Sequence, residues 1–306
     1  MYRHVVVLCS VALAALGATS AGLAADPERC RELARPFQTE KPQISAMEVS
    51  LALFSAVDGN CIDLATKLLD NGASVDARDR FGTRPLSRAA RAGHLEMVDL
   101  LLARGAPIDA RNLAGATALY FAAERGRGPV ARRLIERGAD VNLTGPSGIS
   151  PVAAAAFAGN DPIVAALLAH GAEANAPDDT GKPPIVYAAA RARIDVVERL
   201  LAQNIDINAR YRNDLTLLMW AAGPDEKVLE AHAVKVVEYL LDAGAHVDDR
   251  DDRGRTALMI AAEGGHAEIA ALLLIRGADP SLKDKAGKRA ADLTELSALR
   301  ERLTAR

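Results

Sequence analysis

Aromatic residues are scarce in this chain: phenylalanine, tyrosine and tryptophan make up only 4% of its 306 residues. Hydrophobic residues are nevertheless half of the sequence, so alanine and the aliphatic residues supply most of the apolar volume. A single bulky core assembled around large rings is therefore disfavoured. Small side chains allow helices to approach closely, and the composition predicts thin layers of packed helices.

Long runs of one charge are also missing. The chain has 37 basic and 40 acidic residues, a formal net charge of −3, and the two signs alternate along the sequence. Nucleic acid and anionic membranes are bound mainly through concentrated positive charge. The charge pattern therefore argues against both as partners.

The motifs of common catalytic and metal sites are absent from the sequence. Its six histidines include no His-Glu-x-x-His pair, and no cysteine stands near them at zinc-ligand spacing. There is no Gly-x-Ser-x-Gly elbow and no glycine-rich phosphate loop. We therefore expect no catalytic residues, no metal and no cofactor. An enzyme with an unrecognised site is the alternative, because a fold alone does not exclude activity.

The first 25 residues differ from the rest of the chain. Arg3 and His4 precede the apolar run "VVVLCSVALAAL", which is followed by a stretch of small residues. This order is typical of a secretory signal peptide over residues 1–25, with cleavage near Ala24 or Ala25. It predicts a periplasmic or secreted protein that has no membrane segment after cleavage. An uncleaved anchor is the alternative, although the apolar run is short for a bilayer.

Only two of the three cysteines follow that segment, Cys30 and Cys61. In an oxidising compartment a lone pair of cysteines favours a disulfide. Two buried free thiols are the alternative. No Cys-x-x-Cys motif indicates redox chemistry.

A glycine that follows each leucine-rich run recurs at a fixed interval. It occupies Gly72, Gly105, Gly138 and Gly171, then Gly244 and Gly277, with 33 residues between neighbours in each series. Asn204 stands where the next glycine is due, and asparagine also tolerates a left-handed backbone. The 40 residues from Asn204 to Gly244 imply an insertion of seven.

A second marker keeps the same spacing. The phrases are "RPLS" at 84, "TALY" at 117, "SPVA" at 150, "PPIV" at 183, "TLLM" at 216 and "TALM" at 256. Threonine, serine and proline favour the start of a helix, and an alanine pair follows each phrase. Aliphatic residues with helical spacing then precede the glycine. Each unit is therefore a pair of helices that can bury its apolar faces only by stacking on its neighbours.

The best-defined units are "GTRPLSRAARAGHLEMVDLLLARGA" at 82–106 and "GRTALMIAAEGGHAEIAALLLIRGAD" at 254–279. They resemble the ankyrin repeat. The resemblance extends from about residue 47 to the C-terminus and implies an all-α solenoid of about eight stacked helix-turn-helix units with short hairpin finger loops. The chain departs from the family pattern at the helix-start histidine, which is replaced by Ser87, Tyr120, Ala153, Val186, Met219 and Met259. The turn histidine is present only at His94 and His266.

The predicted organisation follows from these markers. After the signal peptide, residues 26–45 form an N-terminal helix and linker, and residues 46–306 form the repeat domain. Its first unit, 46–78, is degenerate, regular units begin at 79, and the last unit, 283–306, is truncated. Residues 223–233 hold the insertion, which is either a partner-specific elaboration or a longer helix with a tolerated loop. The single tryptophan, Trp220, is interpreted as a core residue.

By resemblance to the family, a ligand would contact the residues just before and just after each first helix. Exposed Phe81, Leu113 and Phe157 among arginines have the composition of a protein-binding patch. The alternative is that Phe157 and Leu113 pack between neighbouring finger loops. The complete predicted binding strip is Arg80, Phe81, Arg91, Leu113, Glu124, Arg125, Ile149, Phe157, Lys182, Arg191, Arg212, Asn213, Arg253 and Glu263.

The sequence thus predicts a monomeric, non-catalytic protein that binds a protein partner through its concave face. Three uses fit this description: a scaffold for an envelope enzyme, an immunity partner that blocks a toxin, or an effector directed at a host. The residues do not distinguish among them.

Overall fold

The computed structural model describes residues 26–37, 45–224 and 227–304. The expected signal peptide and residues 38–44 of the expected linker lie outside the described residues. The α-helices are α1 (Pro27–Ala34), α2 (Ala46–Asp58), α3 (Ile62–Asp70), α4 (Pro85–Ala92), α5 (Leu95–Ala103), α6 (Ala118–Glu124), α7 (Gly128–Glu136), α8 (Pro151–Ala158), α9 (Asp161–Ala169), α10 (Pro184–Ala190), α11 (Ile194–Leu201), α12 (Leu217–Ala222), α13 (Glu230–Asp242), α14 (Ala257–Glu263), α15 (Ala267–Ile275), α16 (Ala290–Leu293) and α17 (Ser297–Thr304). Short 3-10 helices are η1 (Arg35–Phe37), η2 (Pro146–Gly148) and η3 (Arg212–Asp214).

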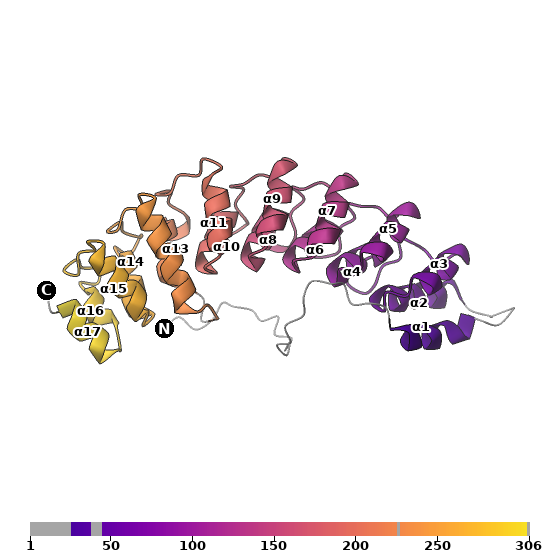
Figure 1. Ribbon diagram of the computed structural model, residues 1–306, viewed down its shortest axis with the longest axis horizontal. Helices are drawn as coiled ribbons and strands as arrows, with labels where there is room; N and C mark the ends of the chain where they lie inside the picture. Colours follow the sequence, from indigo (N-terminus) through magenta and orange to yellow (C-terminus); the bar gives the residue numbers. More distant parts are fainter. Residues whose placement is uncertain (1–25, 38–44, 225–226, 305–306) are drawn as a thin grey trace.

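From α2 onward the helices form eight consecutive pairs that stack into a curved rod (Figure 1). In the pairs from α2–α3 to α10–α11, the first helix lies on the inner side of the curve and the second on the outer side. Neighbouring first helices pack more closely than neighbouring second helices everywhere except between the units α12–α13 and α14–α15, and this difference accounts for the curvature. The described residues contain no strand, so the predicted all-α solenoid of about eight units is confirmed.

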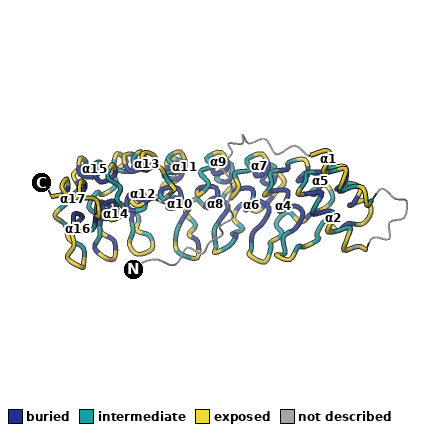
Figure 2. Tube along the Cα trace, turned by 90° about the horizontal axis from the view of Figure 1, so that it is seen from below, coloured by how far each residue is buried: buried dark blue, intermediate teal, exposed yellow. Residues whose placement is uncertain are grey.

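Alanine explains the close approach of the inner helices. The alanine pairs Ala89–Ala90, Ala122–Ala123, Ala155–Ala156, Ala188–Ala189, Ala221–Ala222 and Ala261–Ala262 are all completely buried. Leucine, isoleucine and valine from the second helices complete a hydrophobic core that continues through the stacked units. Buried residues accordingly run along the interior of the whole rod, while the loop tips are exposed (Figure 2).

Most first helices begin at the residue types that the sequence predicted. The hydroxyl of Thr117 accepts a hydrogen bond from the Tyr120 amide at 3.1 Å, and Thr256 caps α14 in the same way at 3.3 Å. Pro85 instead begins α4, where its missing N–H costs nothing. Asn204 has a φ of 61°, so it does occupy the left-handed turn in place of glycine.

Each finger loop is closed by a backbone hydrogen bond between residues four apart, such as Asp79 N to Thr83 O at 3.0 Å. In most fingers an aspartate or asparagine at the base also accepts hydrogen bonds from two amides of its own loop, as Asp79 does from Phe81 and Thr83. The finger that begins at Gly145 lacks this carboxylate. A Cβ at Gly145 would lie 2.5 Å from the ring of Tyr120, so the ring occupies that space.

Neighbouring finger loops are also connected by backbone hydrogen bonds. Leu113 N donates to Phe81 O at 3.1 Å, and Asp179 N donates to Ser147 O at 3.0 Å. Lys285 N donates to Arg253 O in the same manner at 2.9 Å. These bonds fix the relative positions of the loop tips that they join along one edge of the rod.

Helix α1 packs against α2 and α3 at the N-terminal end of the rod. Cys30 of α1 and Cys61, which precedes α3, are joined as a disulfide in the structure, with Cα atoms 5.5 Å apart. The backbone geometry therefore permits the expected pairing, and its formation in the native protein stays a prediction. At the other end, Leu299 and Leu303 of α17 are buried against the last unit.

The insertion changes both the connection and the helix that follows. In this unit α12 ends at Ala222 and α13 begins at Glu230, and α13 has 13 residues where the second helices of the other units have 8 or 9. Residues 230–233 of the predicted insertion are therefore helical. Across the described part of the chain, none of the helices combines the length and the apolar character needed to cross a membrane.

Candidate functional site

The predicted strip divides into two rows at opposite ends of the first helices. The row that we name the finger row precedes these helices and consists of Arg80, Phe81, Leu113, Ile149, Lys182, Arg212, Asn213 and Arg253. The row that we name the turn row lies at or just after the helix ends and consists of Arg91, Glu124, Arg125, Phe157, Arg191 and Glu263. The rows are separated by the first helices, about 10 Å of helix length.

A third set of side chains fills the space between these rows. It consists of Arg88, Phe121, Tyr187, Trp220 and Ile260, one from each of α4, α6, α10, α12 and α14, and we name it the middle row. None of these residues was in the predicted strip. All five are partly exposed, including Trp220, which the sequence had placed in the core. The face is therefore wider and more aromatic than expected.

In the finger row, the apolar side chains are presented to solvent. Phe81 is 57% exposed and Leu113 is 82% exposed. The guanidinium of Arg80 lies 4.7 Å from the centre of the Phe81 ring. Leu113 is therefore largely open to solvent, although its side chain lies against Gly82 of the neighbouring finger and its backbone is bonded to Phe81. Ile149 and Lys182 are only partly exposed.

In the turn row, Phe157 is the main apolar side chain, with 47% of its surface exposed. The guanidinium of Arg191 lies 4.7 Å from its ring centre. The two carboxylates of this row are already paired: Glu124 lies 3.2 Å from Arg125, and Glu263 lies 2.8 Å from Arg255. The row thus combines a half-exposed ring with cations.

Aromatic and cation–π contacts connect the three rows into one face. Phe157 of the turn row and Tyr187 of the middle row meet edge to face, with ring centres 6.2 Å apart. Lys182 of the finger row places its ammonium 5.5 Å from the Tyr187 ring and 5.8 Å from the Trp220 ring. Such contacts contribute about 0.5–1 kcal/mol each at partly exposed sites.

The Tyr187 hydroxyl donates a hydrogen bond to the carboxylate of Asp178 at the base of its finger. Burial, and then the bond to Asp178, raise the pKa of Tyr187. Burial opposes ionisation of Asp178, but the bonds from Tyr187, Lys182 N and Thr180 outweigh it and lower the pKa of this carboxyl. Tyr187 is thus a neutral phenol whose one O–H is already donated to Asp178, and this bond fixes the position of the ring.

Among the described residues, no group of three or more histidine, cysteine, aspartate or glutamate side chains is arranged to hold a metal ion. Burial raises the pKa of Tyr120 to about 12 and of Tyr211 to about 12. Both phenols are therefore neutral at physiological pH, and neither is poised for proton transfer.

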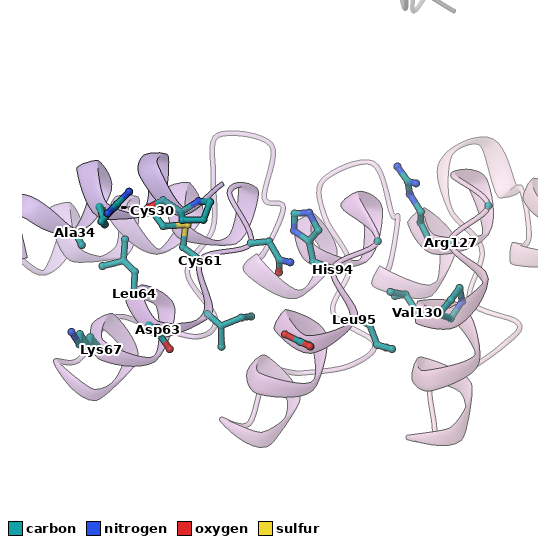
Figure 3. Close-up of a pocket in the computed structure, with 18 residues that line it drawn as sticks. Cys30, Ala34, Cys61, Asp63, Leu64, Lys67, His94, Leu95, Arg127 and Val130 are labelled. Atoms are coloured by element: carbon teal, nitrogen blue, oxygen red, sulfur yellow. Dashed lines mark hydrogen bonds between the residues drawn. A yellow bond between two sulfur atoms is a disulfide. The ribbon is translucent and has the colours of Figure 1, made fainter. Parts of the chain in front are cut away.

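A separate hollow of about 1010 Å³ lies beside α1 (Figure 3). It runs along the turns between first and second helices, past Cys61, His94 and Arg127. It shares no residue with the three rows. His94 contributes to its wall while bonding, through Nδ1, to the carbonyl of Val57 at 3.0 Å. This histidine therefore joins two units, and the repeat accounts for it.

Comparison with known proteins agrees with this architecture. The family model described as ankyrin repeats (3 copies) matches residues 53–145, 140–211 and 209–284. Human Ankyrin repeat domain-containing protein 63 is 44% identical over 72 residues, and the mouse protein of that name is 42% identical over the same length. These alignments cover 24% of this chain and 18% of each relative. The chain thus matches less than a fifth of the length of these curated relatives.

A solved structure matches over a larger part of the chain. The crystal structure of the human ASB11 ankyrin repeat domain aligns with a TM-score of 0.66 and 29% sequence identity. The alignment covers 73% of this chain and 97% of that domain. Because the family model matches from residue 53 to residue 284, and the stacked helix pairs have the same architecture, this chain belongs to the ankyrin-repeat family.

Proposed function

We propose that this chain is a non-catalytic module that binds another protein through the face formed by the three rows. Ankyrin repeats are in general protein–protein interaction modules, and they match this chain from residue 53 to residue 284. The observation that carries the proposal is the clustering of exposed apolar side chains and cations on one face of consecutive units. Tryptophan, tyrosine and arginine are the residues that most often dominate binding energy at protein interfaces.

The face formed by the three rows contains two aromatic side chains that can anchor a partner. Phe81 and Phe157 are about half exposed, so a partner could bury most of the remaining surface of each ring. Their contacts with Arg80 and Arg191 restrict the rings before binding, which lowers the entropy lost on association. The bonds between finger loops keep this surface rigid in the same way.

The test is affinity capture with a chain that begins at Asp26 as bait. Phe81→Ala combined with Phe157→Ala removes two exposed rings, so the fold should be retained. The matched control is Leu229→Ala combined with Ile275→Ala, which removes two exposed apolar side chains, 69% and 76% exposed, outside the three rows. We expect the first variant to weaken a captured complex by about thirtyfold or more and the control to leave it unchanged. A complex that survives the first variant unaltered refutes the assignment of this face.

We further propose that the chain acts in the periplasm or outside the cell, on the strength of its N-terminal sequence. The charged start, apolar run and small residues of 1–25 support processing near Ala24 or Ala25. Mass spectrometry of the N-terminal peptide from fractionated cells tests this directly. A chain recovered from the cytosol with Met1 intact overturns the location and leaves the binding face untouched.

A further inference from the structure

The three rows carry a charge opposite to that of the whole chain. The fourteen residues of the finger and turn rows include seven basic side chains and two acidic ones, in a chain whose formal net charge is −3. We infer that the partner presents an acidic segment in which carboxylates alternate with apolar side chains. This inference rests on the proposed function and specifies the chemistry of what that face recognises.

The cations most relevant to this inference are Arg91 and Lys182. Arg91 lies 5.9 Å from the ring centre of Phe121, and Lys182 lies over Tyr187 and Trp220. Among the described residues, neither cation forms an ion pair with a carboxylate. Each therefore keeps N–H groups available, and a carboxylate that approached would form a charge-assisted hydrogen bond.

The carboxylates nearby do not compete for these cations. Glu124 is paired with Arg125, and Glu263 is paired with Arg255. Asp178 accepts bonds from Tyr187 and from the amides of its own finger. The acids of the face thus stabilise the fold or their immediate neighbours, and Arg125 and Arg253 share in these ion pairs. Arg91 and Lys182 are the cations toward which no carboxylate of the face is directed.

The ring faces favour an acidic peptide over a nucleic acid. Proteins that bind single strands stack bases on open aromatic faces. Here Arg91 covers a face of Phe121, and Lys182 lies over both Tyr187 and Trp220. What remains accessible is half of Phe157 together with Phe81 and Leu113, which suit aliphatic or aromatic side chains. A peptide segment with acidic residues to pair with the cations and apolar residues to contact these side chains matches both properties of the face.

A displayed library of random linear peptides, selected on the chain that begins at Asp26, tests the inference without knowledge of the partner. The variant is Arg91→Gln combined with Lys182→Gln. The control is Arg132→Gln combined with Lys235→Gln, which makes the same charge change at two exposed positions on the outer helices α7 and α13. We expect the enriched peptides to be acidic and apolar, to bind the variant about tenfold more weakly, and to bind the control as they bind the parent.

The outcomes separate this inference from the proposed function. Enriched peptides that are neutral or basic, yet lose binding to the Phe81→Ala, Phe157→Ala protein, overturn the acidic preference and keep the face. Peptides that bind every variant equally overturn both. Failure to enrich any peptide overturns the acidic preference alone. A labelled single-stranded oligonucleotide is the second probe, and binding tighter than that of the acidic peptides also overturns the inference.

Discussion

Gly145 is the position where a single added methyl group gives the sharpest test of the packing. A Cβ there would lie 2.5 Å from Cδ2 and Cε2 of Tyr120, whereas carbon atoms in ordinary contact are about 3.5–4 Å apart. Tyr120 is only 5% exposed, so its ring has little room to move. The φ of Gly145 is −93°, which any residue can adopt, so the effect of Gly145→Ala is purely steric. Overpacking of this kind costs about 1–3 kcal/mol of unfolding free energy.

Urea unfolding followed by circular dichroism measures this cost, and a double-mutant cycle assigns it. Gly145→Ala should be nearly neutral once Tyr120→Ala has removed the ring, although Tyr120→Ala alone is strongly destabilising. Gly181→Ala is the control: its φ is +80° and no atom lies within 4 Å of the added Cβ, so only the left-handed backbone is penalised, by about 1 kcal/mol. Equal costs of Gly145→Ala with and without the Tyr120 ring would show that the ring does not exclude other residues at 145.

Three further predictions concern stability. Leu134→Ala should cost about 2–5 kcal/mol in urea unfolding because Leu134 is completely buried in the middle of the stack; a cost under about 1 kcal/mol contradicts its place in the core. Burial lowers the pKa of His94 below its ordinary value of 6.5. As the pH drops below 6.5, His94 therefore takes up a proton in the unfolded chain before it does so in the folded chain, and the stability of the fold should fall. In thermal melts, His94→Gln should lose less stability over the same pH range. Thiol titration of protein from an oxidising compartment should find Cys30 and Cys61 unreactive, and replacing both by alanine should cost about 3 kcal/mol; free thiols refute the pairing.

The fold could be read from the sequence because stacking imposes the same demands on every unit. The alanine pairs must be small wherever inner helices touch, and the turn at Asn204 must be left-handed. Each requirement recurs every 33 residues, so the residue type needed at a position can be read from the equivalent positions of the other units even where one unit differs. The same logic predicted the helix pairs, their number and the position of the insertion. It left two interpretations of the insertion open, because no other unit has a counterpart, and the helical residues 230–233 agree with the longer helix.

The proposed binding face was only partly predictable for the opposite reason. Phe121, Tyr187 and Trp220 are apolar residues inside helices, and an apolar helical residue is normally assigned to the core. Helical periodicity alone could not show that the inner helices of a curved stack leave one more column of side chains accessible. Phe81 and Leu113 were identified because they precede the helices, and Phe157 because it lies at the end of α8, where an apolar residue has less of a stacking role.

A comparison of the repeat units nevertheless contains evidence for the middle row, which the predicted strip did not include. Positions that stack must hold similar residues in every unit, as the alanine pairs do. The middle-row column, by contrast, changes from Arg88 to Phe121, then through the buried Ala154 to Tyr187, Trp220 and Ile260. A column that varies this widely in size and charge is not set by one repeated packing contact, and five of its six members are partly exposed. Comparing the units of one chain with each other therefore identifies positions that stacking leaves accessible, and here three of them carry aromatic rings.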